Sequence, residues 1–413
     1  MSDTAPVAKG PHVLRGMNRA ALLDALRRSE GAVSLTELVA LTSLSRPATT
    51  RSVDDLVDLG LVERSASRSG GAVGRPAQRV RFRRELGCVA GVQVSAHEVH
   101  AVLADLGGTL LTEVRVATTA VADEVLEAVL GALRTVVAED ASATGLWAIG
   151  IGTTGIVDTG TGRIRTASNI PGWSALPVTE RVAEAFGCPV LIDNDVRLAA
   201  LAERTVGVAR GVDTFAFVHW DEQVGTGLVI DGTPFRGATM ASGELGLVDV
   251  FRDPDRATPE GSLPREGVPG PFERRVSTLA VRALAADLAT RDPLVADALA
   301  GTDPADVLGA LVGAADAGST EAAAAVERLV GWFCAGVAAL VLVVDPGTVV
   351  LGGRTSRVGP PLADAVRAEL GRTTMEPPRV LLSGLGESAV ATGAVRLALT
   401  AVDVRLGHAV ATP

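Results

Sequence analysis

Tyrosine is absent from the 413-residue chain, and all aromatic residues together make up only 3% of it. The cores must therefore be built mainly from Ala, Val and Leu. Cysteine is also scarce, with only Cys88, Cys188 and Cys334. An odd number at wide spacing fits neither a disulfide framework nor a thiolate zinc site, which predicts a reducing cytoplasm. No apolar leader opens the chain, and the longest apolar run, residues 329–344, falls short of the roughly 18 residues of a membrane span. We expect a buried helix there and no membrane partner.

Basic charge is concentrated at the N-terminal end of an acidic chain. The formal net charge is −10, but residues 1–85 hold 14 basic and 9 acidic residues, against 24 and 39 in the rest. Almost all of the basic residues are arginines, because Lys9 is the only lysine. This distribution predicts two units, a head of residues 1–85 that meets a polyanion and a body of residues 86–413.

The first 60 residues have the pattern of a helix-turn-helix. Apolar spacing predicts a helix over residues 18–28, and Ser34 with Glu37 has the capping-box form that starts a second helix near residue 35. After a short turn, Ser45 is the N-cap candidate of a third helix that runs to about residue 59. We expect the opening turns of this helix to contact DNA. The candidates are Ser45, Arg46, Thr49, Thr50 and Arg51.

The following residues predict a wing. Residues 61–64 and 78–83 read as two strands around a loop rich in glycine and serine. Within the loop, Gly74, Arg75 and Pro76 present an arginine that could enter a minor groove. The alternative is that the three helices form a plain packing unit.

The body alternates strands with helices. A three-strand meander is expected at 88–94, 98–106 and 110–116, then helix 121–139, strand 146–152, helix 178–186 and strand 190–193. A comparable series begins at 214–218 and 227–231 and ends with strands at 348–352 and 379–382. Two similar α/β halves predict a bilobal body with a central cleft.

Four segments of the body carry a family resemblance. They are Asn-Ile-Pro-Gly-Trp at 169–173, Ile-Asp-Asn-Asp at 192–195, Gly-Glu-Leu-Gly at 243–246 and Val-Leu-Gly-Gly at 350–353. Their order and spacing resemble the ROK family, which unites bacterial sugar kinases and sugar-responsive repressors. The implied fold is α/β, a winged helix-turn-helix followed by a bilobal actin-like, sugar-kinase (ribonuclease H-like) ATPase fold.

Departures from the family pattern predict that kinase activity is lost. Family kinases hold phosphate with an Asp-x-Gly-Gly-Thr-Lys loop, but residues 93–98 read Gln-Val-Ser-Ala-His-Glu. Asp221 and Gln223 stand where a second loop usually has glycines. Asp195 matches the family's general base and is interpreted as a relic of it. We therefore expect no catalytic residue and no cofactor.

The family zinc site is also eroded. Leu247 replaces a histidine ligand, and the loop at 264–273 lacks the three family cysteines, so no metal is expected. His97 and His100 are interpreted as surface residues rather than metal ligands.

A sugar site is implied by resemblance. Its residues are Asn169, Asn194, Asp195, Glu244 and Glu273. The structural alternative is that Asn169 caps a turn, Asn194 and Asp195 cap the next helix, and Glu244 stabilises a loop.

The sequence thus predicts a cytoplasmic transcriptional regulator of the ROK type, a repressor of carbohydrate-related genes. Its expected partners are a double-stranded DNA operator and a sugar or sugar-derivative effector. A homodimer or dimer of dimers is expected, because two heads match the half-sites of a palindrome. Two alternatives stay open: a sugar kinase with a DNA-binding extension, and a DNA-binding regulator that responds to no ligand.

Overall fold

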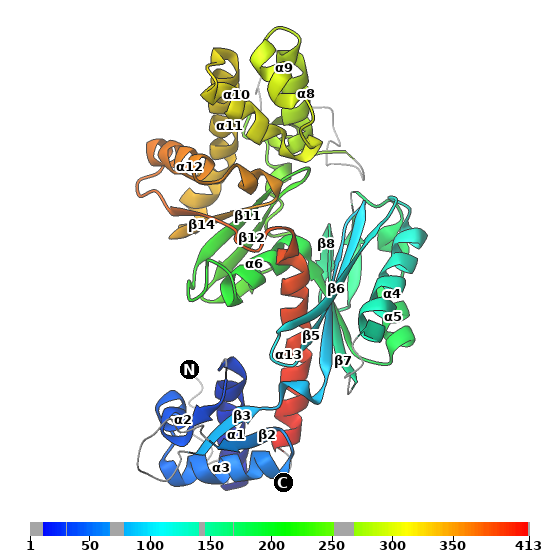
Figure 1. The fold of residues 1–413 in the computed structure, drawn as a ribbon, viewed down its shortest axis with the longest axis vertical. Helices are drawn as coiled ribbons and strands as arrows, with labels where there is room; N and C mark the ends of the chain where they lie inside the picture. The colour runs from blue at the N-terminus through cyan, green and yellow to red at the C-terminus, as the bar shows by residue number, and fades with distance from the viewer. Residues whose placement is uncertain are drawn as a thin grey trace, which may run out of the picture.

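The computed structural model describes residues 11–29, 31–66, 78–139, 145–167, 169–251 and 268–411. In it the chain forms a head and two lobes, and one long helix, α13, runs between them (Figure 1). Each lobe is built on a five-stranded sheet.

The head contains three helices and a small sheet. The helices are α1 (Pro11–Arg28), α2 (Leu35–Thr42) and α3 (Arg46–Asp58), and the strands are β1 (Val33–Ser34), β2 (Val62–Ala66) and β3 (Gln78–Phe82). The sheet order is β1-β3-β2. The capping box at Ser34 and Glu37 is present as predicted. The first helix begins at Pro11, seven residues before the predicted start.

Lobe one follows a short 3-10 turn (Arg84–Leu86). Its strands are β4 (Cys88–Val94), β5 (Glu98–Asp105), β6 (Leu110–Ala117), β7 (Leu146–Thr153) and β10 (Val190–Asn194), in the order β10-β7-β4-β5-β6. The ribbon β8 (Ile156–Asp158) and β9 (Arg163–Thr166) stands apart from this sheet. Helices α4 (Ala122–Glu139) and α5 (Val178–Phe186) lie on one face, and α13 (Ala389–Ala411) packs on the other.

Lobe two repeats the same topology. Its strands are β11 (Phe215–Trp220), β12 (Val224–Ile230), β13 (Thr233–Phe235), β14 (Thr348–Gly352) and β15 (Arg379–Leu382), in the order β13-β12-β11-β14-β15. In both sheets the first three strands are antiparallel and the last two are added in parallel. Its helices are α7 (Glu273–Val276), α8 (Thr278–Ala289), α9 (Pro293–Leu299), α10 (Val307–Asp316), α11 (Thr320–Val344) and α12 (Pro360–Thr373). The repeat confirms the predicted two-half body.

The apolar run at 329–344 is part of α11. Among the described residues, α11 is the one helix that is long and apolar enough to cross a membrane. It packs against α10 and α12, and Phe333 is stacked on Trp220 at 3.7 Å between ring centroids. The helix therefore supplies part of the core of lobe two, as the sequence predicted, although Leu342 and Val343 near its C-terminal end are exposed.

Two helices fill the space between the sheets. α6 (Asp195–Thr205) contacts β12 of lobe two, and α13 contacts both α6 and the sheet of lobe one. The C-terminal half of α13 continues into the head, where Val402 and Leu406 share a core with Leu22 and Leu26 of α1. The domain boundary between residues 85 and 86 stays a prediction. α13 contacts both the head, which precedes this boundary, and lobe one, which follows it.

Candidate functional site

The exposed face of α3 carries two of the predicted DNA contacts. Arg46 and Arg51 are exposed, and Thr50 is half-buried with its hydroxyl bonded to the carbonyl of Arg46 at 3.0 Å. Ser45 caps the helix by accepting the N–H of Ala48 at 3.4 Å. Arginine side chains on the first turns of such a helix suit contacts to phosphates and guanine edges.

The prediction that Thr49 contacts DNA is wrong. Its side chain is fully buried, and its hydroxyl donates to the carbonyl of Ser45 at 3.2 Å. Thr49 lies on the same helical face as the buried Ser52, Val53 and Leu56, so it belongs to the core of the head. The predicted wing residues Gly74, Arg75 and Pro76 lie outside the described residues.

A cleft of about 750 Å³ lies between the two lobes. Its lining includes Asn169, Asp195 and Glu273 from the predicted sugar site. We call this part the carboxylate end. The other part, the outer half, is lined by Glu98, Arg115, His219, Asp221, Glu222, Arg354, Arg357 and Glu387. Of the remaining predicted sugar residues, Asn194 and Glu244 do not line the cleft.

Asn169 joins the two lobes inside the cleft. Its Oδ1 accepts the hydroxyl of Thr154 at 2.5 Å, and its Nδ2 donates to Oε1 of Gln223 at 3.4 Å. Gln223 is one of the residues that replace a family glycine, so this side chain now crosses the cleft. Both residues line the cavity and have amide groups within reach of a bound hydroxyl.

Asn194 has the structural role that the sequence left open. Its Oδ1 accepts the N–H of Arg197 at 3.1 Å as the N-cap of α6, and its Nδ2 donates to the carbonyl of Gly155 at 3.0 Å. The side chain is 9% exposed. Its amide holds the first turn of α6 against lobe one, which sets the position of the neighbouring Asp195.

The two carboxyl groups of the carboxylate end, Asp195 and Glu273, also interact with the carboxyl group of Glu244, which does not line the cleft. The pKa of Asp195 is raised to about 7, mainly by burial and also by the nearby charge of Glu244, while the N–H of Val196 opposes the shift. Burial also raises the pKa of Glu273 to about 7, again with a contribution from Glu244. The pKa of Glu244 itself is raised by burial and lowered by Arg197. Near neutral pH Asp195 and Glu273 are each partly protonated and can donate or accept hydrogen bonds, which suits sugar hydroxyls.

A buried ion pair behind these carboxyls was missed at the sequence level. Asp193 and Arg197 are 1% and 2% exposed and lie 2.7 Å apart, and Arg236 contacts the other oxygen of Asp193 at 2.8 Å. Arg197 also donates to the carbonyl of Met240 at 2.9 Å. The spacing of Asp193 and Arg197, four residues apart across a helix start, was the available signal. The cluster fixes the chain around Asp195.

In residues 93–98, where the family kinases have their first phosphate loop, the Ser95 side chain bonds the backbone of the turn. Ser95 donates its hydroxyl to the carbonyl of Glu98 at 3.0 Å and accepts the N–H groups of Glu98 at 3.1 Å and His97 at 3.4 Å. These amides are the kind of donor that a phosphate cradle would offer. Here they are bonded within the turn between β4 and β5.

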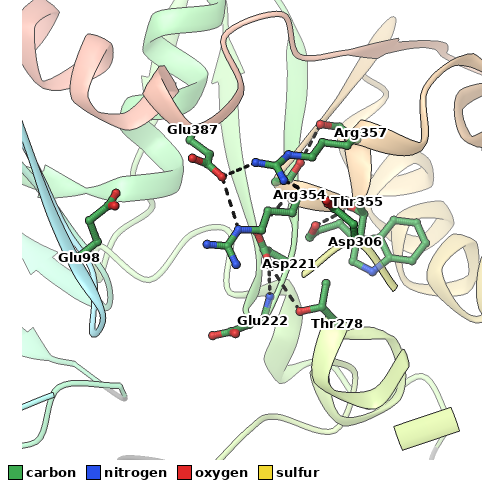
Figure 2. Close-up of polar contacts among 12 residues, drawn as sticks. Glu98, Asp221, Glu222, Thr278, Asp306, Arg354, Thr355, Arg357 and Glu387 are labelled. Atoms are coloured by element: carbon green, nitrogen blue, oxygen red, sulfur yellow. Dashed lines mark hydrogen bonds and ion pairs between the residues drawn. The ribbon is translucent and has the colours of Figure 1, made fainter. Parts of the chain in front are cut away.

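Asp221 accepts one backbone N–H from the second loop and one from the turn after β14. Its carboxylate accepts the N–H of Glu222 at 2.8 Å and the N–H of Arg354 at 3.0 Å (Figure 2). The second of these amides follows the glycine pair at 352 and 353, which by resemblance to the family kinases lies on the nucleotide side of the cleft. An intramolecular carboxylate thus takes the place that an anionic ligand would need.

Glu387 gathers three arginines at the outer half of the cleft. It contacts Arg357 at 2.6 Å, Arg354 at 3.6 Å and Arg115 at 3.8 Å. Arg115 comes from β6 of lobe one, whereas Arg354 and Arg357 follow β14 of lobe two, and Glu387 lies two residues before the start of α13. Figure 2 shows Glu387 directed at the two arginines of lobe two. The ion pairs therefore link both lobes to the start of α13.

His100 is not the surface residue that the sequence predicted. It is fully buried in β5, and its Nε2 lies 2.8 Å from Oε2 of Glu113. Burial lowers its pKa. His97 is exposed. Within the described residues, no group of three His, Cys, Asp or Glu side chains is placed to hold a metal ion. The loop residues 264–267 lie outside that part of the chain.

With this fold and cleft in view, the chain belongs to the ROK family. Residues 89–401 match the family's sequence profile, and residues 16–71 match that of the MarR family. The protein is thus a ROK body joined to a winged helix-turn-helix, and the predicted fold class is confirmed.

Individual relatives include both regulators and kinases. A protein of Caldicellulosiruptor sp. (strain Rt8B.4), provisionally named as a xylose repressor, is 26% identical over 89% of this chain and 92% of its own. A glucokinase of Streptomyces coelicolor is 26% identical over 76% of this chain and 98% of its own.

Solved structures give the same division. A ROK family transcriptional regulator, described as a homologue of the E. coli MLC protein, superposes with a TM-score of 0.72 over 97% of this chain and 99% of its own at 20% identity. A ROK glucokinase of Streptomyces griseus, solved with glucose and AMPPNP, gives a TM-score of 0.64 over 76% of this chain and 100% of its own at 28% identity. The regulator's fold covers the head, which the kinase's does not.

Proposed function

We propose that this protein is a DNA-binding transcriptional regulator, a repressor of carbohydrate-related genes, that senses a sugar in its interlobe cleft. The MarR-type head supports DNA binding, and the relative named for xylose repression has the same extent as this chain. Arg46 and Arg51 on α3, with Arg75 in the wing, contact the operator. A homodimer or dimer of dimers in the cytoplasm presents two heads to a palindrome.

The observation that carries the loss of kinase activity is the carboxylate of Asp221. Phosphoryl transfer depends on cationic and amide groups that cradle the phosphates. Asp221 takes two of the amides, and Glu98 and Glu222 add negative charge to the same half of the cleft. Asp195 then accepts or donates hydrogen bonds to a sugar instead of acting as a general base.

α13 connects the sugar-binding cleft to the DNA-binding head. Its first residues, Ala389 and Val390, line the cleft, and its last turns pack on α1 of the head. Arg27 of α1 forms an ion pair with Asp403 of α13. A ligand that changes the lobe separation shifts α13, and the head moves with it. The coupling is then a free energy, typically about 1 to 3 kcal/mol, between the two sites.

The test is to map the protein's genomic binding sites and then titrate the bound duplexes in gel-shift assays with a panel of sugars. Specific duplexes whose affinity changes with one sugar support the proposal. Indifference to every genomic duplex contradicts it, and affinity that no sugar changes favours the ligand-independent alternative.

The kinase alternative is favoured by one observation, the full-length match of ROK glucokinases to the body. It is tested separately by measuring sugar phosphorylation with ATP. Turnover would establish an enzyme with a DNA-binding extension.

A further inference from the structure

The cleft is larger than its carboxylate end requires. Its volume of about 750 Å³ is in the range of sites that enclose ligands of about drug size, larger than one sugar ring. One cavity is lined both by Asn169, Asp195 and Glu273 and by the residues of the outer half. Loss of the phosphate cradles has changed the lining of that half but has not filled its space.

The lining of the outer half disfavours an anionic occupant. Four carboxylates line it, at Glu98, Asp221, Glu222 and Glu387, against three arginines. Each arginine already has a carboxylate partner: Arg115 contacts Glu98 at 2.7 Å, Arg357 contacts Asp306 at 3.1 Å, and Arg354 contacts Glu387 at 3.6 Å. A phosphate would therefore meet repulsion from the acids and would have to break ion pairs to gain a cation.

The same lining suits neutral hydroxyl groups. Paired carboxylates and guanidinium groups keep spare lone pairs and N–H groups that can bond hydroxyls. Burial lowers the pKa of His219 below its ordinary 6.5, so its imidazole is neutral at pH 7 and has one donor and one acceptor. Figure 2 shows Glu98 facing the group of Arg354 and Glu387 from the other lobe. Polar groups thus approach the outer half from two sides.

We infer that the effector is a disaccharide or longer neutral glycoside, with one ring at the carboxylate end and the next in the outer half that nucleotide occupies in a kinase. This inference rests on the proposed function and specifies its ligand. Gln223 lies between the two rings, since it lines the cavity and bonds Asn169 of the carboxylate end. Glu222, Arg354 and His219 contact the second ring.

The experiment compares each monosaccharide with its own disaccharide by isothermal titration calorimetry on the full-length protein. The probes are xylose with xylobiose, glucose with cellobiose, and glucose with maltose. In at least one pair, we expect the disaccharide to bind about tenfold tighter or better, because the second ring adds hydrogen bonds and buried area. Monosaccharide binding without a gain in any pair overturns the inference and leaves the proposed function standing. No binding of any probe overturns the inference and favours the ligand-independent alternative, whereas failure of DNA recognition would appear separately in the gel-shift assays.

Two variants locate the second ring. Glu222→Gln removes one charge at similar size, and Ser388→Trp fills space at the outer half, which Ser388 lines. Each should reduce the gain of the disaccharide several-fold while the affinity for the monosaccharide stays the same. The control Glu376→Gln changes an exposed glutamate outside the cleft and should leave both affinities unchanged. If both variants keep the full gain, the second ring does not occupy the outer half and the inference fails.

Discussion

The carboxylate of Asp221 accepts the backbone N–H of Arg354 at 3.0 Å, and this bond joins the end of β11 to the turn after β14. In the ROK pattern both segments belong to the nucleotide side of the cleft. We therefore expect no phosphorylation of glucose or xylose with Mg²⁺ and ATP, and no rise in melting temperature on addition of ATP. A coupled ADP-release assay and a thermal-shift titration check this. Turnover above the rate without protein would contradict it.

The exposed arginines of α3 should determine operator affinity. Arg46→Ala and Arg51→Ala should each weaken binding to the specific duplex by about 1 to 3 kcal/mol if they reach base edges. Arg75→Ala, in the predicted wing loop, should have a similar effect. The control is Arg181→Ala, which removes an exposed arginine of α5 in lobe one. Gel-shift titrations at fixed salt measure the effect, and a residue whose variant binds like the control does not contact DNA.

Thr49 gives a prediction of the opposite kind. Because its side chain is buried and its hydroxyl bonds Ser45 within the helix, Thr49→Val should change operator affinity less than Arg46→Ala does. Its main effect should be on stability of the head. Thermal unfolding and gel shift on the same preparation separate the two. A loss of affinity as large as that of the arginine variants would return Thr49 to the DNA contacts.

Stability should fall as the pH rises towards neutral. The pKa values of Asp195 and Glu273 are about 7 in the folded protein, above the ordinary 3.8 and 4.5, so between those limits the folded state binds more protons than the unfolded state. The stabilisation is complete below the unfolded pKa and is lost as the pH rises to about 7. Melting temperatures measured across this range should decline less in Asp195→Asn with Glu273→Gln than in the natural protein. Equal slopes would contradict the assignment.

Coupling between cleft and head should depend on the contact between α1 and α13. Arg27 contacts Asp403, and its guanidinium also lies 5.7 Å from the ring centre of Phe82 in β3. Asp403→Ala should reduce the effect of an effector sugar on operator affinity while sugar affinity stays the same. Asp364→Ala, which breaks an exposed pair with Arg367 on α12, is the control. An unchanged effector response in Asp403→Ala would mean that the contact does not transmit the signal.

Most of the secondary structure was predictable because local patterns and long-range packing agree here. The predicted α5, β14 and β15 match the observed Val178–Phe186, Thr348–Gly352 and Arg379–Leu382. The burial of Thr49 was not predicted, although Thr49 has the same helical spacing as the apolar residues of α3. A short polar side chain in the first turns of this helix suggested a DNA contact instead. His100 was missed because β5 is buried on both faces, and alternation cannot show which partner covers each face.

The candidate site was predictable only in part. Family patterns located Asn169, Asp195 and Glu273, which line one cavity as expected. They could not reveal that Gln223 reaches Asn169 or that Arg236 reaches Asp193, since these contacts join residues more than 40 positions apart. The cap role of Asn194 depends on the direction of one side chain. Such contacts follow from tertiary packing, and the spacing of residues along the sequence cannot predict them.

α13 is held so closely that it connects the parts of this protein rigidly. A Cβ added at Gly393 would lie 1.9 Å from the carbonyl oxygen of Leu198 in α6, and one added at Gly150 of β7 would lie 2.0 Å from that of Ala394. Because three separate segments support this helix, chimeras that exchange only residues 1–85 with another regulator would leave α13 without its partner. Grafting a new DNA specificity onto this sensor would require transplanting the last turns of α13 together with the foreign reading domain.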